Sequence, residues 1–315
     1  MSQTLAELGE FGLIERLRAD QENGGPVWIG PGDDAAVLSI DGRAVSALDQ
    51  LVEGVHFRRD WSGPVEVGRK AVAVAVADIE AMGARPLAVL VGLAAPGDLP
   101  ASWALDCLAG LRQECATASV QLIGGDVSAA ERIHLAVTAL GETRGQEPVQ
   151  RSGATVGDLV ALRGRLGWAA AGLVVLTRGF RSPRAAVQAH QCPTPPYGAG
   201  AEAAMFGATA MIDLSDGLLA DLGHVARASG VGIDLDSRAL GPGEPVRAVA
   251  QAIGRDPLEF VLSGGEDHAL VATFPFGQVP QGWDVIGRVE AVGPLGPTVL
   301  VDGRAWSGPA GWTHF

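Results

Sequence analysis

The sequence predicts an α/β (α+β) protein with a two-domain architecture. Strand-like apolar runs alternate with longer helix-like runs, and glycine, proline and aspartate separate them. The 315 residues are 47% hydrophobic, which is enough to fill a sizeable core, and a chain of this length suits about two domains. The composition changes between residues 145 and 158, so we expect one domain over 1–150 and a second over 151–315.

Apolar spacing between residues 5 and 17 predicts an amphipathic helix near the start of the chain. The segment Val65–Met82 is ambiguous, because valines alternate with alanines as in a strand, yet the apolar run is long and ends at Gly83 as a buried helix would. Its length favours the helix. The strands expected in this half are Ala44–Leu48, Val120–Ile123 and Ile133–Leu140.

The second half repeats the alternation of helices and strands. The expected elements are a helix over Gly167–Thr177, a proline-rich loop over Cys192–Tyr197, a strand over Ala208–Leu214, a turn over 215–217, a helix over Leu218–Ala228 and a strand over Val231–Leu235. Both halves are therefore expected to be α/β.

The charge balance excludes several classes of protein. A formal net charge of −13 argues against a nucleic-acid-binding scaffold and against a protein that binds anionic membranes. The first residues lack the basic start and long apolar core of a secretory signal, and no apolar stretch is long enough to span a bilayer. Three cysteines without metal-like spacing indicate reduced thiols. We therefore expect a cytoplasmic protein.

Acidic residues recur beside glycines or at the ends of expected elements, where a backbone can approach a ligand closely. They are Asp33, Asp34, Asp49, Asp78, Asp126, Asp213, Asp216, Glu266 and Asp267. A pair of like charges at ~4 Å costs about 4 kcal/mol at an effective dielectric near 20, so converging carboxylates would need cations. Oxygen ligands favour Mg²⁺ or Ca²⁺, and Mg²⁺ commonly joins protein carboxylates to substrate phosphates.

The scarcity of lysine supports metal-assisted phosphate binding. Lys70 is the only lysine in the chain, and no G-x-x-x-x-G-K-[ST] sequence is present, so a P-loop is excluded. The motifs of protein kinases are also missing. If the protein handles a nucleotide, metal ions and backbone amides must supply the electrostatic stabilisation.

Each motif also has a structural interpretation. The segments 32–34, 124–126 and 264–267 could be simple turns, and Asp49 could be a solvated strand end. Asp78 lies within an apolar run and could form a buried salt bridge with Lys70 or Arg85. Asp216 could cap the following helix, whereas Asp213 precedes it on the strand. His56 could be a structural histidine and Arg151 a charge in a linker; only the joint set favours a functional site.

In their order along the chain, these motifs resemble the thiamine-monophosphate kinase family. That family belongs to the ATP-binding superfamily of aminoimidazole ribonucleotide synthetase, selenophosphate synthetase and the hydrogenase maturation protein HypE. The resemblance covers nearly the whole chain. The matching stretches are GEFGLIERL, GDDAAV, LDQLVEGVHF, ADIEAMGARP, LIGGDVS, RSGATVGD, IDLSDGLLADL, SGGEDHAL and GWTHF.

The resemblance implies ATP-dependent phosphorylation of thiamine monophosphate to thiamine diphosphate, the last step of thiamine diphosphate synthesis. It implies several Mg²⁺ ions and direct in-line transfer without a catalytic side chain. It also implies an aminoimidazole-ribonucleotide-synthetase-like fold, in which the N-terminal ATP- and metal-binding domains of a homodimer pair their sheets into a barrel. The C-terminal domain would complete the active site.

The resemblance also implies roles for individual residues, matched position by position. The metal-binding positions are Asp33, Leu48 through its carbonyl, Asp49, Asp78, Asp126, Asp213 and Asp216. The ATP-contacting positions are Gly125, Asp126, Arg151 and Ser215. The positions that contact the thiamine phosphate are His56, Glu266 and Trp312.

The sequence departs from the family pattern at three places. Ala47 and Leu48 replace a hydroxyl pair, Ala77 replaces a serine before Asp78, and His268–Ala269 replace a Tyr-Glu pair. Two alternatives stay open: another ATP-dependent enzyme of the superfamily, such as one similar to aminoimidazole ribonucleotide synthetase, and a non-enzymatic Ca²⁺-binding module. The second lacks the D-x-[DN]-x-[DN]-G spacing of an EF-hand.

Overall fold

The structure is a computed structural model that describes residues 3–18, 24–31 and 35–311. The chain forms two compact units, which are described separately. Unit 1 comprises Met1–Ile79 and Arg85–Gly145, and unit 2 comprises Glu80–Ala84 and Gln146–Phe315. Among the residues described, no helix combines the length and apolar character that a bilayer crossing requires.

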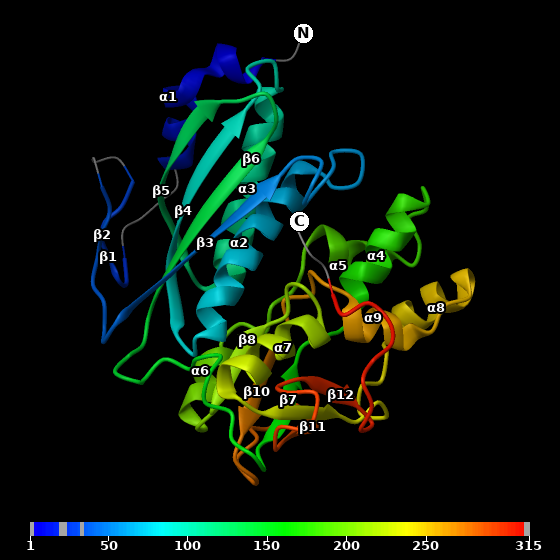
Figure 1. Cartoon of the computed structure of the whole chain (residues 1–315). Coiled ribbons are helices and arrows are strands. Elements are labelled where there is room, and N and C mark those ends of the chain that lie inside the picture. The colour runs from blue at the N-terminus through cyan, green and yellow to red at the C-terminus, as the bar shows by residue number, and fades with distance from the viewer. Residues whose placement is uncertain (1–2, 19–23, 32–34, 312–315) are drawn as a thin grey trace. The chain divides into compact units, whose positions relative to one another are not determined.

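Unit 1 is built from three helices and six strands within its described residues (Figure 1). In chain order they are α1 (Leu5–Arg18), β1 (Val27–Ile29), β2 (Val37–Leu38), β3 (Ala44–Val52), α2 (Pro64–Ala81), β4 (Arg85–Ala95), α3 (Ala101–Ala118), β5 (Gln121–Ala129) and β6 (His134–Glu142). The ambiguous segment around residues 65–82 is helix α2, as its length favoured. The amphipathic helix near the start is α1, which buries Leu5 and Leu13.

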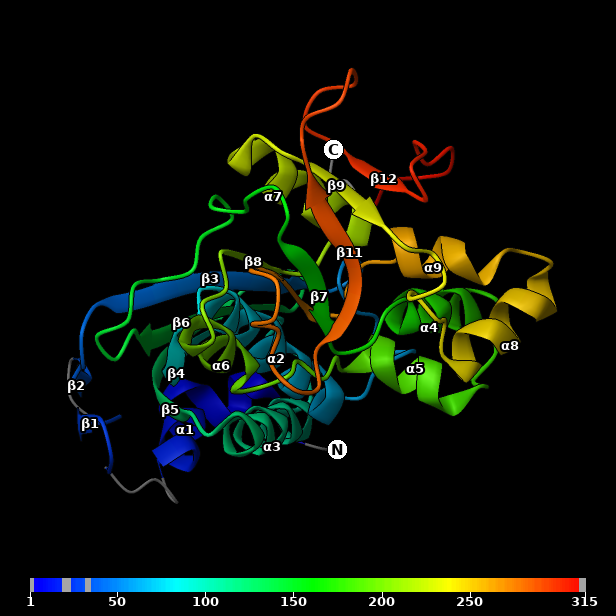
Figure 2. The same cartoon turned by 90° about the horizontal axis from the view of Figure 1, so that it is seen from below.

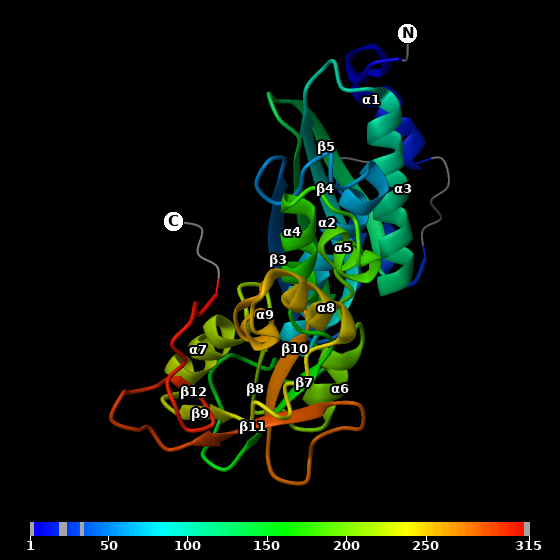
Figure 3. The same ribbon diagram turned by 90° about the vertical axis from the view of Figure 1, so that its right-hand side faces the viewer.

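The main sheet of unit 1 has the strand order β3-β6-β4-β5 in the part of the chain that the structure describes. Its central strands alternate buried and half-buried residues, because one face is covered by helices, which lie on one side of the sheet in Figure 3. Helix α2 is buried along almost its whole length. The opposite face keeps residues such as Thr138 and Ala136 half-buried and Leu48 58% exposed.

Two strands of unit 1 continue beyond their predicted ends. Strand β3 extends through Asp49 to Val52, and strand β5 extends through Gly125 and Asp126 to Ala129. The prediction that these aspartates follow strand ends was wrong, as was the alternative of a turn at 124–126. The long antiparallel pairing of β3 with β6 and the parallel pairing of β5 with β4 keep both segments extended.

Unit 2 contains the remaining elements of the described chain. They are β7 (Leu159–Arg163), α4 (Trp168–Thr177), α5 (Arg184–Gln191), α6 (Ala199–Met205), β8 (Ala210–Asp213), α7 (Leu218–Ser229), β9 (Gly232–Leu235), α8 (Glu244–Ile253), α9 (Pro257–Ser263), β10 (Leu270–Phe274), β11 (Asp284–Glu290) and β12 (Val299–Val301). The predicted helices over 167–177 and 218–228 and the predicted strands over 208–214 and 231–235 are confirmed within about three residues.

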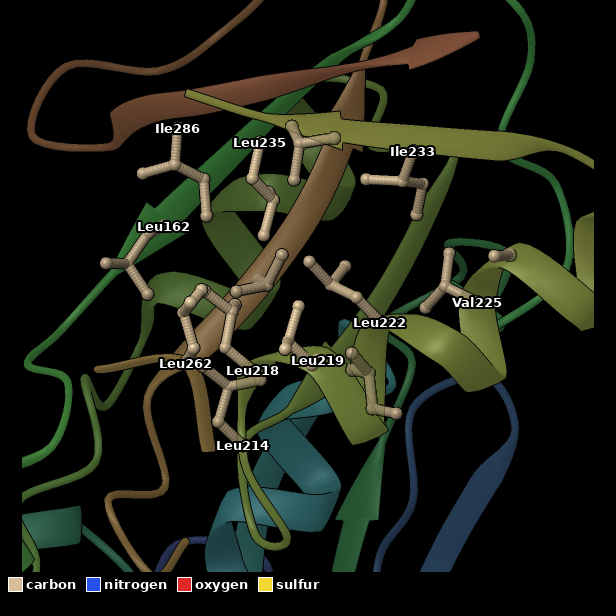
Figure 4. Close-up of a cluster of buried hydrophobic side chains, with 14 of the residues drawn as sticks. Leu162, Leu214, Leu218, Leu219, Leu222, Val225, Ile233, Leu235, Leu262 and Ile286 are labelled. Carbon is tan, nitrogen blue, oxygen red and sulfur yellow. The ribbon is translucent and has the colours of Figure 1, made fainter. Parts of the chain in front are cut away.

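The sheet of unit 2 has the order β12-β9-β11-β7-β10-β8 within the described residues, and Figure 2 shows β7 beside β11. Its pairs are antiparallel except β12 with β9. Alternate residues of the strands face two cores, one against α7 and α9 and the other against α6. Figure 4 shows the first core, in which Leu214 and Leu218 are buried on either side of the turn at 215–217. These two leucines anchor that turn.

Candidate active site

Two predicted site residues lie outside the described residues, namely Asp33 and Trp312. The other candidates fall into two groups. Unit 1 holds Leu48, Asp49, His56, Asp78, Gly125 and Asp126, and unit 2 holds Arg151, Asp213, Ser215, Asp216 and Glu266.

Asp49 and Asp126 of unit 1 lie on the two edge strands of the four-stranded sheet. Asp49 pairs with Val137, which pairs with Val91, which pairs with Gly125. Residues in such a row share a face, so Asp49 shares a face with buried Val137. Asp126, one residue beyond this row, points to the opposite, less covered face, about 14 Å away at three strand spacings. Within unit 1, the sheet therefore does not bring these two carboxylates together.

Gly125 is required by the packing of the sheet. A methyl group at this position would lie 2.1 Å from the carbonyl oxygen of Val91, so the close approach of β5 to β4 admits only glycine. The residue and its neighbour Asp126 are exposed. The exposed backbone is compatible with an ATP contact, although the glycine itself is explained by strand pairing.

The remaining acidic candidate of unit 1 is Asp78, which is half-buried on α2 among fully buried neighbours. Arg85, one of its two predicted ion-pair partners, lies 3.3 Å from Glu142 through Nη1 and Oε1. Leu48 exposes its side chain on β3. Because β3 is an edge strand, part of its backbone carbonyls point away from β6, which suits the predicted role of a carbonyl ligand.

His56 follows β3 in a loop that buried Lys70 holds in place. Lys70 is 2% exposed, and its Nζ donates to the His56 carbonyl oxygen at 3.1 Å. The Val52 N–H donates to Nδ1 of His56 at 3.0 Å, which assigns the hydrogen of the neutral ring to Nε2. An Nε2–H group suits a phosphate oxygen as acceptor. The single lysine of the chain thus shapes a candidate substrate loop instead of binding phosphate itself.

In unit 2 the two acidic loops, 214–217 and 264–269, are joined by backbone hydrogen bonds. Glu266 N–H donates to the Ser215 carbonyl at 2.8 Å, and His268 N–H donates to the Leu214 carbonyl at 2.9 Å. Glu266 and His268 have φ angles of 65° and 50°, in the left-handed region that non-glycine residues rarely adopt. Such strain is maintained only where surrounding contacts hold it, as these bonds do.

Asp213 ends strand β8 with its carboxylate buried against a histidine. His268 Nδ1 lies 3.1 Å from Asp213 Oδ2, and both side chains are less than 10% exposed. A buried carboxylate needs such a donor. His268 stands where the family pattern has a tyrosine, and in this chain its ring is the partner of the buried Asp213 carboxylate.

Asp221 supports the turn that carries Asp216. Its Oδ2 accepts the N–H groups of Asp216 at 3.1 Å and of Gly217 at 3.0 Å. The pKa of Asp221 is raised to about 7, by burial first and then by the nearby negative charges of Asp213 and Asp216, against the effect of the two amides. Asp216 itself does not cap α7, whose N-cap residue is Gly217 without a side-chain hydrogen bond. The capping alternative is therefore wrong.

Arg151 is exposed and lies near the same acidic turn. The pKa of His224 on α7 is lowered by burial first, then by the charges of Arg227 and Arg151, while Asp216 opposes them. The Arg151 carbonyl accepts the Ser229 hydroxyl at 3.2 Å, which fixes its backbone to the end of α7. Arg151, Ser215 and Asp216 thus belong to one region of unit 2.

Asp221 and His190 were missed at the level of sequence. Asp267 was named among the acidic residues without a role, and His268 only as a departure from the family pattern. Asp221 gave a usable signal, since a carboxylate within the apolar run of α7 needs a partner, as argued for Asp78. The histidines gave none, because their partners lie far along the chain.

The oxygen-only donors of this region fit Mg²⁺. Burial is the main cause of the raised pKa of Asp221, and the negative charges of Asp213 and Asp216, which add to it, are a potential that a cation would relieve. Within residues 3–18, 24–31 and 35–311, however, no group of three or more His, Cys, Asp or Glu side chains is arranged to hold a metal ion. Asp213 and Asp216 are the two predicted ligands that unit 2 places near one another.

Comparison with known proteins agrees with this fold. Residues 32–143 match the family model "AIR synthase related protein, N-terminal domain". The chain is 50% identical over 316 residues to a thiamine-monophosphate kinase of Mycobacterium tuberculosis, covering 100% of this chain and 94% of that protein. It is 40% identical to the thiamine-monophosphate kinase of Corynebacterium glutamicum, covering 99% and 95%. The solved structure "AaThiL complexed with AMPPCP and TMP" matches with a TM-score of 0.81 at 34% identity, covering 100% of both chains.

The fold, with its N-terminal domain and acidic loops, thus defines a protein of the AIR synthase-like class. Within that class, the identity along the whole chain is decisive. The chain belongs to the thiamine-monophosphate kinase family.

Proposed function

We propose that this protein transfers the γ-phosphoryl group of ATP to the phosphate of thiamine monophosphate, forming thiamine diphosphate and ADP. The observation that carries the proposal is 50% identity along the full chain to a thiamine-monophosphate kinase. The solved structure of AaThiL complexed with AMPPCP and TMP, which is similar over all of both chains, supports the same pair of substrates. No observation favours an aminoimidazole ribonucleotide synthetase or a Ca²⁺-binding module.

The side chains of this protein bind and orient the reactants. The acceptor is a phosphate oxygen, which is already ionised near neutral pH, so no general base is required. His56 would donate from Nε2 to the thiamine phosphate, and Glu266 would contact the same substrate. Arg151, Ser215 and the exposed backbone at 125–126 would contact ATP.

Mg²⁺, when bound, would neutralise the phosphates and allow the two anionic substrates to approach each other. Its proposed ligands are Asp33, Asp49, Asp78, Asp126, Asp213 and Asp216 together with the carbonyl of Leu48. Asp221 would hold the amides of Asp216 and Gly217, and so fix the carboxylate of Asp216 for that role. Unit 1 is proposed as the part that binds ATP and metal.

We also propose a cytoplasmic homodimer. The three free, buried cysteines are typical of a reducing compartment. The less covered face of the unit 1 sheet, with the apolar side chain of Leu48 58% exposed, offers a surface on which a second copy could pair. Light scattering on Leu48→Glu would then show a monomer where the wild type gives a dimer.

The function is tested by incubating the purified protein with ATP, Mg²⁺ and thiamine monophosphate. We expect thiamine diphosphate and ADP in equal amounts and no product after complete chelation. Recovery of activity when Mg²⁺ is added back after chelation is the control for metal dependence. Absence of thiamine diphosphate, or full turnover after chelation, would overturn the proposal.

A further inference from the structure

His190 lies against Glu266, although the two residues are far apart in the sequence. Nδ1 of His190 is 3.2 Å from Oε2 of Glu266. The His190 side chain is 6% exposed, whereas the Glu266 side chain is 33% exposed. One end of the glutamate is therefore held by a buried ring while the rest of the carboxylate is accessible to a ligand.

The position of His190 is determined by the packing of α5 against α4. A methyl group on Gly172 of α4 would lie 2.1 Å from the Ala186 carbonyl oxygen and 2.9 Å from Cβ of His190. The backbones of the two helices are thus in direct contact at this glycine. His190, in the last turn of α5, cannot move without moving this contact.

Helix α4 is in turn attached to the residue beside Glu266. The carboxylate of Asp267 accepts the N–H groups of Gly167 and Ala169 at the start of α4, the second at 2.9 Å. A closed chain of contacts results, from Glu266 to His190, through α5 and α4 to Asp267, and back to Glu266. Glu266 is also held by its own N–H bond to Ser215 and by its left-handed backbone.

This arrangement holds the Glu266 carboxylate and backbone from several sides. An ionised carboxylate repels a ring nitrogen that carries a lone pair, so a favourable contact places a hydrogen on Nδ1 of His190. The two groups lie within ion-pair distance without the alignment of a hydrogen bond, so the contact acts by electrostatic attraction, which is strong where water is excluded. A ring anchored by two helices therefore defines one orientation of Glu266.

We propose that His190 is a positioning residue that orients Glu266 for binding thiamine monophosphate. The inference rests on the proposed function and deepens it, because it assigns a determinant of affinity for the phosphate acceptor as distinct from ATP. His190 acts through Glu266 and does not touch the reactants.

The test compares His190→Leu, which removes the donor, with His190→Asn, whose amide nitrogen replaces Nδ1. We expect His190→Leu to raise KM for thiamine monophosphate by at least about tenfold, with KM for ATP unchanged. His190→Asn should restore KM to within about threefold of the wild type, because the donor is kept. A purely structural role would not distinguish the two substrates or be rescued by asparagine.

A double-mutant cycle with Glu266→Ala tests whether His190 changes the KM for thiamine monophosphate by acting through Glu266. If His190 acts through Glu266, adding His190→Leu to Glu266→Ala should not raise KM further. Additive effects, or equal changes in both KM values, would overturn the inference. If His190→Leu does not fold, His190→Ala, which cannot overpack the site, is judged by the same criteria.

The two proposals fail differently. A wild-type protein that makes no thiamine diphosphate refutes the proposed function. A wild-type protein that makes it, with an unchanged KM for thiamine monophosphate in His190→Leu, refutes only the positioning role.

Discussion

Unit 1 places its candidate aspartates along regular structure, whereas unit 2 places its own in loops that are braced from several sides. Asp49 and Asp126 are set by strand register, and alternation sends them to opposite faces of the sheet. Asp213, Asp216 and Glu266 lie in two loops joined by backbone bonds, with buried side chains behind them. Strand register alone positions the aspartates of unit 1. The acidic residues of unit 2 need contacts with distant segments of the chain.

The two units differ in how closely they bring their carboxylates together. In unit 2, burial first and then the nearby charges of Asp213 and Asp216 raise the pKa of Asp221 to about 7. Perturbed pKa values of this kind cluster at functional sites, which fits the proposed metal ligands beside Asp221. In unit 1 the sheet separates the carboxylates, so repulsion between Asp49 and Asp126 is small.

The largest expected effect comes from removing one proposed ligand from each unit. Asp49→Ala and Asp216→Ala should each lower kcat at least about a hundredfold, since each removes charge that would hold a metal ion at the phosphates. Steady-state kinetics with Mg²⁺, together with Mn²⁺ binding followed by electron paramagnetic resonance, measure the loss. Asp106→Ala, an exposed residue of α3, is the matched control and should behave as the wild type. Wild-type activity in either ligand variant would remove that residue from the set.

The next effect concerns the stability of unit 2 as a function of pH. Burial raises the pKa of Asp267 to about 7, against its two hydrogen bonds from α4. An aspartate in the unfolded chain has a pKa of about 3.9. Between these values the folded state keeps a proton that the unfolded state has lost. The free energy of unfolding should therefore fall as pH rises from about 4 to about 7, by up to about 4 kcal/mol, and level off above.

Asp267→Asn cannot ionise and should remove the part of this decline that Asp267 contributes, leaving the part due to Asp221, whose pKa is also raised to about 7. Urea unfolding from pH 4.5 to 8 in the presence of EDTA measures the slope for both proteins. At pH 5 the two should differ by about 1 kcal/mol, the value of one lost hydrogen bond to an α4 amide. An unchanged slope in the variant would show that Asp267 is ionised in the folded protein throughout.

The smallest effect comes from two glycines with the same close contact in different units. Methyl groups at Gly125 and at Gly172 would each lie 2.1 Å from a backbone carbonyl oxygen. Each alanine variant should lose about 1–3 kcal/mol of stability from overpacking. Gly172→Ala should in addition raise KM for thiamine monophosphate through α5, and Gly125→Ala should raise KM for ATP. Denaturant unfolding and the two KM values test this contrast.

Gly241→Ala is the matched control for the glycine pair, because no atom lies within 4 Å of the added methyl group. Its stability should stay within about 0.5 kcal/mol of the wild type. Equal KM changes in both variants would show that the two glycines do not act on different substrates, and would remove this distinction between the units.

Local patterning was sufficient for most secondary structure but not for strand ends. Helix α2 was predicted because a long apolar run followed by Gly83 suits a buried helix. Strand β5 was predicted to stop before Gly124, since Gly-Gly-Asp suggests a turn. In the structure β4 lies so close that glycine is required within the strand. A pairing partner more than 30 residues away decided this, and no local pattern reveals it.

The sequence by itself determined the family, the alternation of elements and the acidic loops, because these depend on motifs and on periodicity along the chain. Only the tertiary structure decided that Asp49 and Asp126 face opposite ways, that Asp221 holds the turn of Asp216, and that His190 lies against Glu266. Such relations arise when distant segments pack, since hydrogen bonds and burial depend on distance in space and not on separation in sequence.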